Sequence, residues 1–278
     1  MPTNLLTPVP SDEPGKDRAS APEADAHHNS LYDHPDLFDL AYPGHKGDVD
    51  FYMRHTRDGM ALYLGVGTGR IFAPMYRQND DVIGMDNCPK MVARLFQKYP
   101  DISQDAVKIQ DVRDNSGGNR WPHRVFDKVV APYSFLTQFS GEPESDDINR
   151  ILWHVQRSLK KGGLFITDLF SPHKNPPAKV RTEHERIAIP ERDMLITIDR
   201  DYVHEEDDDF TEVARVHERG IEILQCKLHL QTYRNKDLKR WAQNARLVID
   251  KRLGDFHEET PFNAEESDTM IYFMRNAG

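Results

Sequence analysis

Short apolar runs alternate with helical patterns between Met60 and about Pro172. Each run is four or five residues long, as is typical of strands that are buried on both faces. The runs predict strands at residues 60–64, 81–85, 107–110, 126–130 and 164–167. Strands interleaved with helices in this way imply a mostly parallel sheet that helices cover on both faces.

Amphipathic spacing predicts the helices between these strands. One begins near Arg70, a second spans Pro89 to Tyr99, and a third spans about Asp146 to Leu159. The third helix should end at residues 160–163, where two lysines precede two glycines, because basic residues followed by glycine favour a helix C-terminus.

Beyond Pro172 the pattern changes to the alternation of half-buried antiparallel strands, at residues 195–199, 210–214 and 227–233. The acidic run 205–209 is interpreted as a solvated hairpin tip in preference to a metal site, because oxygen-ligand sites need carboxylates that converge. A final helix and a strand pair are predicted at 235–246, 248–251 and 270–274.

The N-terminal residues have little to bury and are predicted to form a disordered tail. An amphipathic segment begins at Leu31 and resumes at Phe51 after the break at Pro43 and Gly44, which predicts a helical lid. We therefore divide the chain into a tail (1–28), a lid (29–58), a core with the glycine loop (59–172), an antiparallel cover (173–234), and a C-terminal helix and β-hairpin that complete the core sheet (235–278).

Composition and charge narrow the classes of partner and cellular location that we expect. The net charge of −10 and the lack of a Lys/Arg cluster disfavour nucleic acid, so we expect a small-molecule substrate. Cys88 and Cys226 have no CxxC neighbour, which disfavours a disulfide framework or a metal site. The apolar runs are too short to cross a membrane and no signal peptide is evident, so we expect a cytoplasmic protein.

The strongest local signal is a strand that runs directly into the loop 65–69, Gly-Val-Gly-Thr-Gly, and then into a helix. Glycines let the backbone turn sharply and approach a ligand, and a helix N-terminus presents free N–H groups. The spacing is GxGxG, whereas dinucleotide-binding proteins have GxGxxG, so a nicotinamide enzyme is disfavoured. Taken alone, the loop is also compatible with a tight turn that binds nothing.

Two aspartates follow the next two predicted strands. Asp86 ends the second strand, where a carboxylate can accept both ribose hydroxyls of a nucleoside. Asp111 follows the third, where it can accept from an adenine amino group. Ligands of open α/β sheets bind at these carboxyl ends. Either aspartate alone could equally be a helix N-cap.

With these motifs the chain resembles the class I S-adenosylmethionine (SAM) methyltransferases, and among them a bacterial group that acts on small molecules. Residues 62–70 resemble the glycine motif, 82–91 the strand with the ribose-binding acid, 126–133 the motif of the fourth strand, and 159–165 the motif before the fifth. The resemblance covers residues from about 31 to 275. It implies an α/β fold with a Rossmann-like, seven-stranded, mostly parallel sheet and an antiparallel β insertion on the acceptor side.

The resemblance also implies residue roles. The glycines would line the methionine part of SAM, Asp86 its ribose, and Asp111 with Val112 the adenine, on which Met91 would pack; Asn87 and Ala131 are further residues implied near the cofactor. Tyr32 and Tyr42 would belong to a lid over the sulfonium, although a tyrosine taken alone is more often part of the core packing than a ligand contact. The implied cofactor residues are therefore Tyr32, Tyr42, Gly65, Gly67, Gly69, Asp86, Asn87, Met91, Asp111, Val112 and Ala131. No metal is implied.

Position 63 departs from the family pattern. The family usually has Glu or Asp there, which helps to hold the cofactor amino group, whereas this chain has Tyr63. The change motivates a second hypothesis, a SAM-using enzyme with other chemistry such as cyclisation of the aminobutyryl group. A third is a nucleoside-binding subunit without catalysis.

Methyl transfer is an in-line displacement for which the protein supplies alignment and, where needed, a base. Asp168 is the preferred base because a carboxylate at that strand end would face the acceptor. Tyr133, Gln138 and His173 are further candidates on the substrate side. Asp168 could instead cap a turn, and His173 could be an exposed loop residue. We expect a nitrogen, oxygen or carbon acceptor in specialised metabolism, and a monomer or homodimer.

Overall fold

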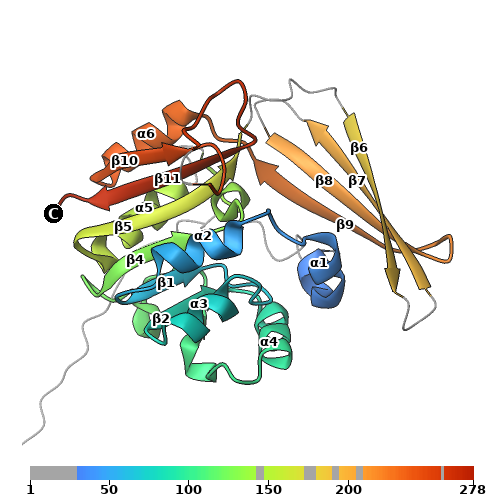
Figure 1. Cartoon of the computed structure of the whole chain (residues 1–278), viewed down its shortest axis with the longest axis horizontal. Coiled ribbons are helices and arrows are strands. Elements are labelled where there is room, and N and C mark those ends of the chain that lie inside the picture. The colour runs from blue at the N-terminus through green and yellow to red at the C-terminus, as the bar shows by residue number, and fades with distance from the viewer. Residues whose placement is uncertain (1–29, 142–146, 172–179, 190–193, 205–208, 258–259) are drawn as a thin grey trace, which may run out of the picture.

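Two β-sheets form the framework of the protein in the computed structural model (Figure 1). The structure describes residues 30–141, 147–171, 180–189, 194–204, 209–257 and 260–278. The larger sheet has seven strands in the order β10-β11-β5-β4-β1-β2-β3, and the smaller has four in the order β6-β7-β8-β9. The predicted tail, 1–28, and residues 205–208 of the predicted hairpin tip lie outside the described residues.

The strands of the large sheet are β1 (Ala61–Leu64), β2 (Val82–Asp86), β3 (Val107–Ile109), β4 (Phe126–Ala131), β5 (Leu159–Phe170), β10 (Leu247–Leu253) and β11 (Thr269–Asn276). β11 runs antiparallel to both of its neighbours, while the pairs among β1 to β5 are parallel. All four residues of β1 are buried, as expected for a central strand with helices on both faces. The predicted seven-stranded, mostly parallel methyltransferase sheet is confirmed.

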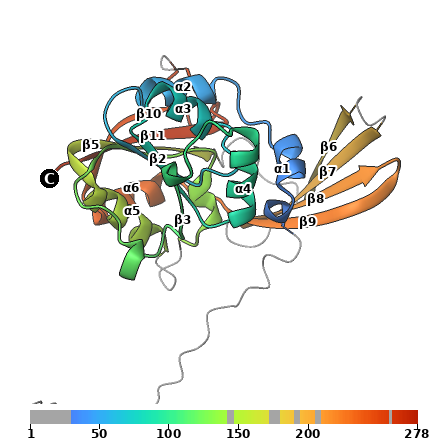
Figure 2. The ribbon, with the colours of Figure 1, turned by 90° about the horizontal axis from the view of Figure 1, so that it is seen from below.

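The helices are α1 (Pro35–Ala41), α2 (Asp48–His55), α3 (Phe72–Gln78), α4 (Pro89–Lys98), α5 (Asp147–Ser158) and α6 (Asn235–Asn244), with short 3₁₀ turns that include η2 (Leu31–Asp33) and η5 (Phe135–Gln138). Figure 2 shows α2 and α3 on one side of the large sheet and α5 and α6 on the other. Successive strand residues point to opposite faces of the sheet. Leu62 and Val129 pack against α5 and α6 on one face, and Tyr63 and Val130 pack against α2, α3 and α4 on the other.

The start of β5 corrects one prediction. The strand begins at Leu159, directly after α5 ends at Ser158, and not at Leu164. Leu159 pairs with Phe126 and Leu164 with Lys128, so residues 160–163 form an irregularity within the strand. Gly162 has a φ of 78° there. The lysines and glycines therefore produce a bulge in a strand, because the edge of β4 continues to pair with the chain on both sides of it.

The small sheet is inserted between β5 and α6. Its strands are β6 (Val180–Ile189), β7 (Met194–His204), β8 (Asp209–Glu218) and β9 (Ile221–Gln231), all antiparallel. The strand β6 was not predicted, because charged residues interrupt its apolar positions. The sheet extends away from the large sheet in both views, with α1 beside it (Figures 1 and 2). Val216 and Cys226 pack against α1 through a small apolar cluster that includes Leu31 and Ala41.

Candidate functional site

The glycine loop after β1 has the sharp backbone that its sequence predicts. Gly65, Gly67 and Gly69 have φ values of 73°, 55° and 87°, a region that side chains other than glycine rarely adopt. The N–H groups of Gly65 and Val66 donate to the carbonyl of Met85 at 2.8 and 3.1 Å, which folds the loop back over β2. The loop thereby forms a backbone cradle at the carboxyl ends of β1 and β2.

Asp86 ends β2 and lies against this cradle. Its Oδ2 accepts from the N–H of Gly67 and its Oδ1 from the N–H of Cys88, both at 2.8 Å. Burial raises the pKa of Asp86 although these N–H groups act in the opposite direction. Met91 is buried, and its methyl group lies 3.6 Å from the position of a Cβ on Gly67. The carboxylate is thus fixed at the edge of the loop, as binding of ribose hydroxyls requires, while Asn87 is exposed.

Asp111 is held by an arginine that the sequence analysis missed. Arg113 donates to both of its oxygens, from Nε at 3.0 Å to Oδ1 and from Nη2 at 2.6 Å to Oδ2, and also to Asp147 at 3.1 Å. Burial alone would raise the pKa of Asp111, but the hydrogen bonds from Arg113 and its charge hold it below the usual value. Val112 and Ala131 are buried in the core beside β3 and β4. Asp111 is therefore a fixed, ionised carboxylate at the third strand end.

Asp168 holds the turn that follows β4. Tyr133 and Ser134 have φ values of 60° and 53°, which is costly for residues other than glycine. Their N–H groups donate to Oδ1 and Oδ2 of Asp168 at 2.8 and 2.9 Å, and the Tyr52 hydroxyl donates to Oδ1 at 2.5 Å. Asp168 has no exposed surface, and burial raises the pKa of its carboxyl group. These contacts give Asp168 a structural task, and its predicted role as a base stays a prediction.

The turn presents Tyr133 to three neighbouring groups. Its ring lies 5.2 Å from the His45 ring and 6.3 Å from the Tyr42 ring, measured between centroids, and the Arg70 guanidinium lies 5.4 Å from its centroid. His45 also stacks on Phe256 at 5.6 Å. His45 and Arg70 were not among the predicted site residues, since nothing in the sequence places residue 45 beside the end of β4. Gln138 of η5 is exposed, and His173 lies outside the described residues.

Tyr63, which stands where the resemblance implies an acid, faces the layer formed by α2 and α3. Its ring is buried and packs edge-on against Phe72 at 5.9 Å. Burial raises the pKa of its phenol, and the positive charge of nearby Arg70 opposes this shift. Tyr63 is therefore neutral and supplies no charge to the site.

The lid contacts both the glycine loop and the inserted sheet. On one side, Asp39 of α1 accepts from Thr68 of the loop and from Lys98 of α4, the latter at 2.8 Å. On the other side, the hydroxyl of Tyr42 donates to Glu212 of β8, which is 4% exposed. The lid thus joins the two parts of the molecule that would contact cofactor and acceptor.

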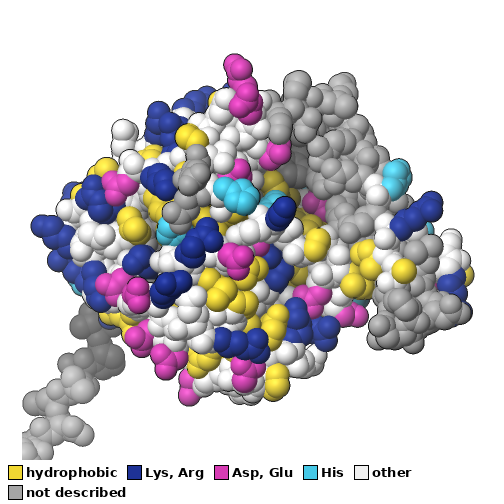
Figure 3. Space-filling model, viewed as in Figure 1, with side chains coloured by type: hydrophobic (Ala, Val, Ile, Leu, Met, Phe, Trp, Pro, Cys, Tyr) yellow, Lys and Arg dark blue, Asp and Glu magenta, His cyan; other side chains and the backbone are white. Residues whose placement is uncertain are grey.

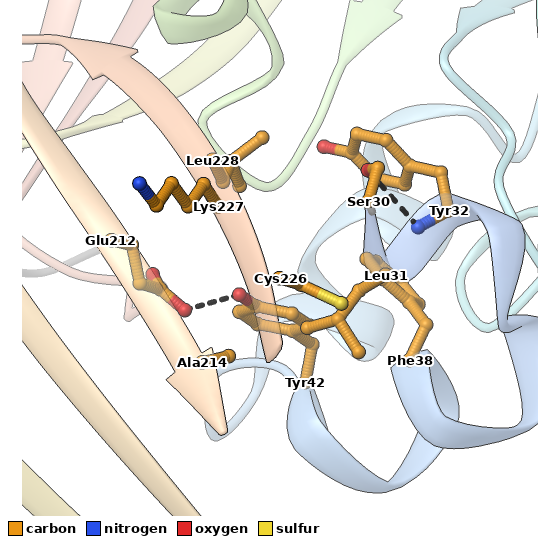
Figure 4. Close-up of a pocket in the computed structure, with 10 residues that line it drawn as sticks. All are labelled: Ser30, Leu31, Tyr32, Phe38, Tyr42, Glu212, Ala214, Cys226, Lys227 and Leu228. Carbon is orange, nitrogen blue, oxygen red and sulfur yellow. Dashed lines mark hydrogen bonds between the residues drawn. The ribbon is translucent and has the colours of Figure 1, made fainter. Parts of the chain in front are cut away.

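A narrow hollow of about 10 Å³, with room for about one water molecule, lies between the lid and the inserted sheet. Figure 4 shows Tyr32 and Tyr42 from the lid on one side of it and Glu212, Cys226 and Leu228 from β8 and β9 on the other. Burial raises the pKa of the Tyr32 phenol, and the negative charges of Asp86 and Glu212 raise it further. Tyr32 is therefore a neutral phenol in the lining of the hollow.

The surface, the remaining side chains and the helices add three observations. On the face shown in Figure 3, Lys and Arg side chains are interspersed with Asp and Glu. Within the described ranges, no group of three or more His, Cys, Asp or Glu side chains is arranged to hold a metal ion. No helix in that part of the chain is long and apolar enough to cross a membrane.

Comparisons with known proteins agree with this geometry. Residues 62–167 match the family model "Methyltransferase domain". A search of curated proteins by sequence found no match. Among solved structures, the chain is similar to an S-adenosylmethionine-dependent methyltransferase from Clostridium acetobutylicum, with 15% identity, 89% of this chain and 98% of the other covered, and a TM-score of 0.68.

Two further structures are similar over most of their length. The CcbJ methyltransferase from Streptomyces caelestis has 18% identity, covers 84% of this chain and 97% of its own, and has a TM-score of 0.69. The sugar N-methyltransferase KedS8 from Streptoalloteichus has 16% identity, covers 93% and 98%, and has a TM-score of 0.66. The glycine cradle and the fixed carboxylate of Asp86 fit a sulfonium nucleoside. The chain contains a match to a methyltransferase domain, and its fold is that of SAM-dependent methyltransferases; SAM is the cofactor that this domain and fold imply.

Proposed function

We propose that the protein transfers the methyl group of SAM to a nitrogen or oxygen atom, or to a carbon atom, of a small-molecule acceptor. The glycine cradle and the fixed carboxylate of Asp86 carry this proposal. The lid contacts both the glycine loop and the inserted sheet and so covers this edge of the large sheet, which favours a small acceptor over a polymer. One of the similar structures is a sugar N-methyltransferase, which supports a small polar acceptor.

In this proposal the cofactor lies across the carboxyl ends of β1 and β2. The glycine loop approaches its methionine part and Asp86 accepts from its ribose, as inferred from the sequence. When bound, SAM supplies a methyl group already activated by the sulfonium. The chain then has to align the acceptor and exclude water, which the lid residues Tyr32 and Tyr42 are placed to do.

The side chains near Tyr133 are candidates for two further roles, positioning of the site and acceptance of a proton from the acceptor. Asp168 holds the strained turn through two N–H groups, so we propose that it positions Tyr133, while its role as a base stays a prediction from the sequence. His45 is half-buried beside Tyr133, and an imidazole ring nitrogen can accept a proton. We therefore propose His45 as the base for an acceptor that must lose a proton, while His173 remains a candidate from the sequence.

Asp86→Ala tests the cofactor placement. The variant should bind SAM at least about tenfold more weakly by calorimetry, because one carboxylate bonded to the ribose is worth about 1.4 kcal/mol or more. Asp81→Ala is the matched control, since Asp81 is exposed and directly precedes the same strand, at the end opposite to Asp86. Equal affinity in the wild type and Asp86→Ala would refute the placement.

The reaction is tested by incubating the protein with SAM and a panel of amino sugars, amino acids and hydroxylated metabolites. Formation of S-adenosylhomocysteine together with a methylated acceptor supports the proposal. Tyr63 motivates the alternative of a non-methylating SAM enzyme, which would release methylthioadenosine instead. Binding of SAM without either product would point to a nucleoside-binding subunit.

The setting of the reaction is also a proposal. The similar structures named above come from bacteria, which supports a bacterial enzyme of specialised metabolism. We further propose a cytoplasmic protein that is a monomer or a homodimer and has no nucleic-acid partner. Light scattering of the purified chain decides the oligomeric state, and a band-shift assay with RNA and DNA tests the last point.

A further inference from the structure

Arg70 is a fixed cation at the end of the glycine loop. It directly follows Gly69, and its Nη1 and Nη2 donate to Oδ1 and Oδ2 of Asp48 at 2.9 and 2.5 Å. Asp48 is the first residue of α2, and its side chain is 3% exposed, compared with 28% for that of Arg70. The Asp48 carboxylate also accepts from the N–H of His45 at 3.1 Å. The pair is thus shielded on the Asp48 side and open on the Arg70 side.

Two further contacts hold the guanidinium in place. Gly44 has a φ of 92°, and a Cβ on it would lie 2.1 Å from Cζ of Arg70, so only glycine allows the lid loop to approach so closely. On another side the guanidinium lies over the Tyr133 ring. Arg70 is therefore enclosed by the lid loop, α2 and the turn after β4, all at the carboxyl edge of the sheet.

The order of the strands indicates which part of the cofactor reaches this place. β1 lies between β2 and β4, and Asp86 is at the end of β2 (Figure 1). If Asp86 binds the ribose, the aminobutyryl group must extend from the ribose across the end of β1 toward β4. The Tyr133 ring follows β4, and Arg70 lies over it. The amino-acid end of the cofactor then lies beside Arg70.

The chemistry of the two groups matches. The aminobutyryl group ends in a carboxylate, and a guanidinium offers N–H groups in a planar fork that suits carboxylates. Asp48 uses two of its five N–H groups, and within the described residues the Arg70 side chain makes no other hydrogen bond. A partly buried guanidinium held by a carboxylate is fixed in orientation before the ligand arrives, which lowers the entropy lost on binding.

We propose that Arg70 binds the carboxylate of the aminobutyryl end of SAM and that Asp48 is the residue that positions Arg70. This inference rests on the cofactor placement given under Proposed function. It assigns the recognition of the amino-acid end to a pair that joins the glycine loop to the lid.

The test compares two ligands that share the nucleoside. S-adenosylhomocysteine has the amino-acid end, and 5′-methylthioadenosine lacks it. By calorimetry, Arg70→Met should bind S-adenosylhomocysteine at least about tenfold more weakly than the wild type and bind methylthioadenosine within about twofold of it. Arg77→Met is the matched control, because Arg77 makes the same bidentate contact with Asp101 on the exposed surface.

Asp48→Asn tests the positioning role. The amide keeps one acceptor but loses the charge, so the loss of affinity for S-adenosylhomocysteine should be smaller than in Arg70→Met, and methylthioadenosine should again be unaffected. A purely structural pair would change the affinity for both ligands together, and that result would overturn the proposal. So would unchanged affinity for both ligands in Arg70→Met.

Asp86→Ala and Arg70→Met distinguish an error in the cofactor placement from an error in the role of Arg70. If the wild type binds neither ligand, or if Asp86→Ala leaves both affinities unchanged, the cofactor placement itself is wrong. If Asp86→Ala weakens both ligands and Arg70→Met weakens neither, only the role of Arg70 is wrong. Thermal unfolding of each variant without ligand shows whether the fold is intact before affinities are compared.

Discussion

The large sheet and the inserted sheet bury the apolar side chains of their strands in different ways. Strands such as β1 are buried on both faces, under α5 and α6 on one side and α2 to α4 on the other. The inserted sheet packs one face of β8 and β9 against α1, while Ile221 and Ile223 of β9 are 69% and 50% exposed. The large sheet is therefore fixed by its own helices, and the inserted sheet depends on the lid.

The same contrast separates the two halves of the site. The glycine loop and Asp86 come from a stretch of about twenty residues, and backbone N–H groups provide most of their contacts. The proposed acceptor side lies between the lid and the strands β8 and β9, which are far apart in the sequence. A backbone site tolerates sequence change in a way that a side-chain site does not, so the acceptor side is where the chemistry of such a fold can diverge.

The largest expected difference between the two regions comes from a glycine pair. Gly69 and Gly220 have φ values of 87° and 79°, so alanine is strained at both. A Cβ on Gly69 would lie 2.7 Å from Cγ of Leu95, whereas a Cβ on Gly220, in the β8–β9 turn, meets nothing within 4 Å. Gly69→Ala should lower the free energy of unfolding by about 3 kcal/mol and Gly220→Ala by about 1 kcal/mol. Urea denaturation gives both values, and equal losses would contradict a tighter glycine loop.

A valine pair gives a smaller difference. Val130 of β4 and Val216 of β8 are both fully buried. Val130→Ala should cost about 2 kcal/mol of unfolding free energy, because its neighbours in the large sheet cannot relax into the space. Val216→Ala should cost about 1 kcal/mol, because the small cluster around α1 can close over the gap.

Hydrogen exchange sharpens this comparison. In Val216→Ala the amides of α1 should exchange faster, while those of β1 keep their protection. The reason is that the apolar cluster that holds α1 loses two methyl groups. Val130→Ala should instead speed exchange across the large sheet. Uniform acceleration in both variants would mean that the two sheets unfold as one unit.

The sequence predicted the core strands within a few residues because each is a short apolar run bounded by turn residues. The structure places β2 at 82–86 where 81–85 was predicted, and β4 at 126–131 where 126–130 was predicted. The glycine loop could also be predicted, because its conformation depends on its own residues. The start of β5 could not, because a bulge depends on the pairing of Leu159 with Phe126. Pairing across strands cannot be read from one segment.

The site could be predicted from the sequence only where its contacts join residues that are close together in the chain. Asp86 and the loop lie close together in the sequence, and the structure places them side by side, while their binding of SAM stays a prediction. The contact between Asp168 and Tyr52 joins residues 116 positions apart, and that between Tyr42 and Glu212 joins residues 170 apart. No spacing rule connects such residues. The surroundings of Asp168, and with them its structural task, could therefore be seen only in the folded chain.

The smallest expected effect is a pH dependence that acts in opposite directions on stability and on binding. Burial raises the pKa of Asp86 in the folded protein. The folded chain therefore takes up a proton more readily than the unfolded chain, and the contribution of Asp86 to the free energy of unfolding falls as pH rises from its ordinary pKa through the raised one. Binding of SAM needs the ionised carboxylate as an acceptor, so affinity should rise over the same window.

Calorimetry with SAM on both sides of this window should show a change of a few fold in affinity, with proton release on binding at its acidic end. Asp86→Asn separates this group from Asp168, whose pKa burial also raises. The amide variant should bind more weakly at all pH values, with a flatter profile. If SAM affinity changed with pH in the same way in the wild type and in Asp86→Asn, a group other than Asp86 would cause the pH dependence. The fixed backbone cradle would then retain its shape but lose its proposed charge partner for the ribose.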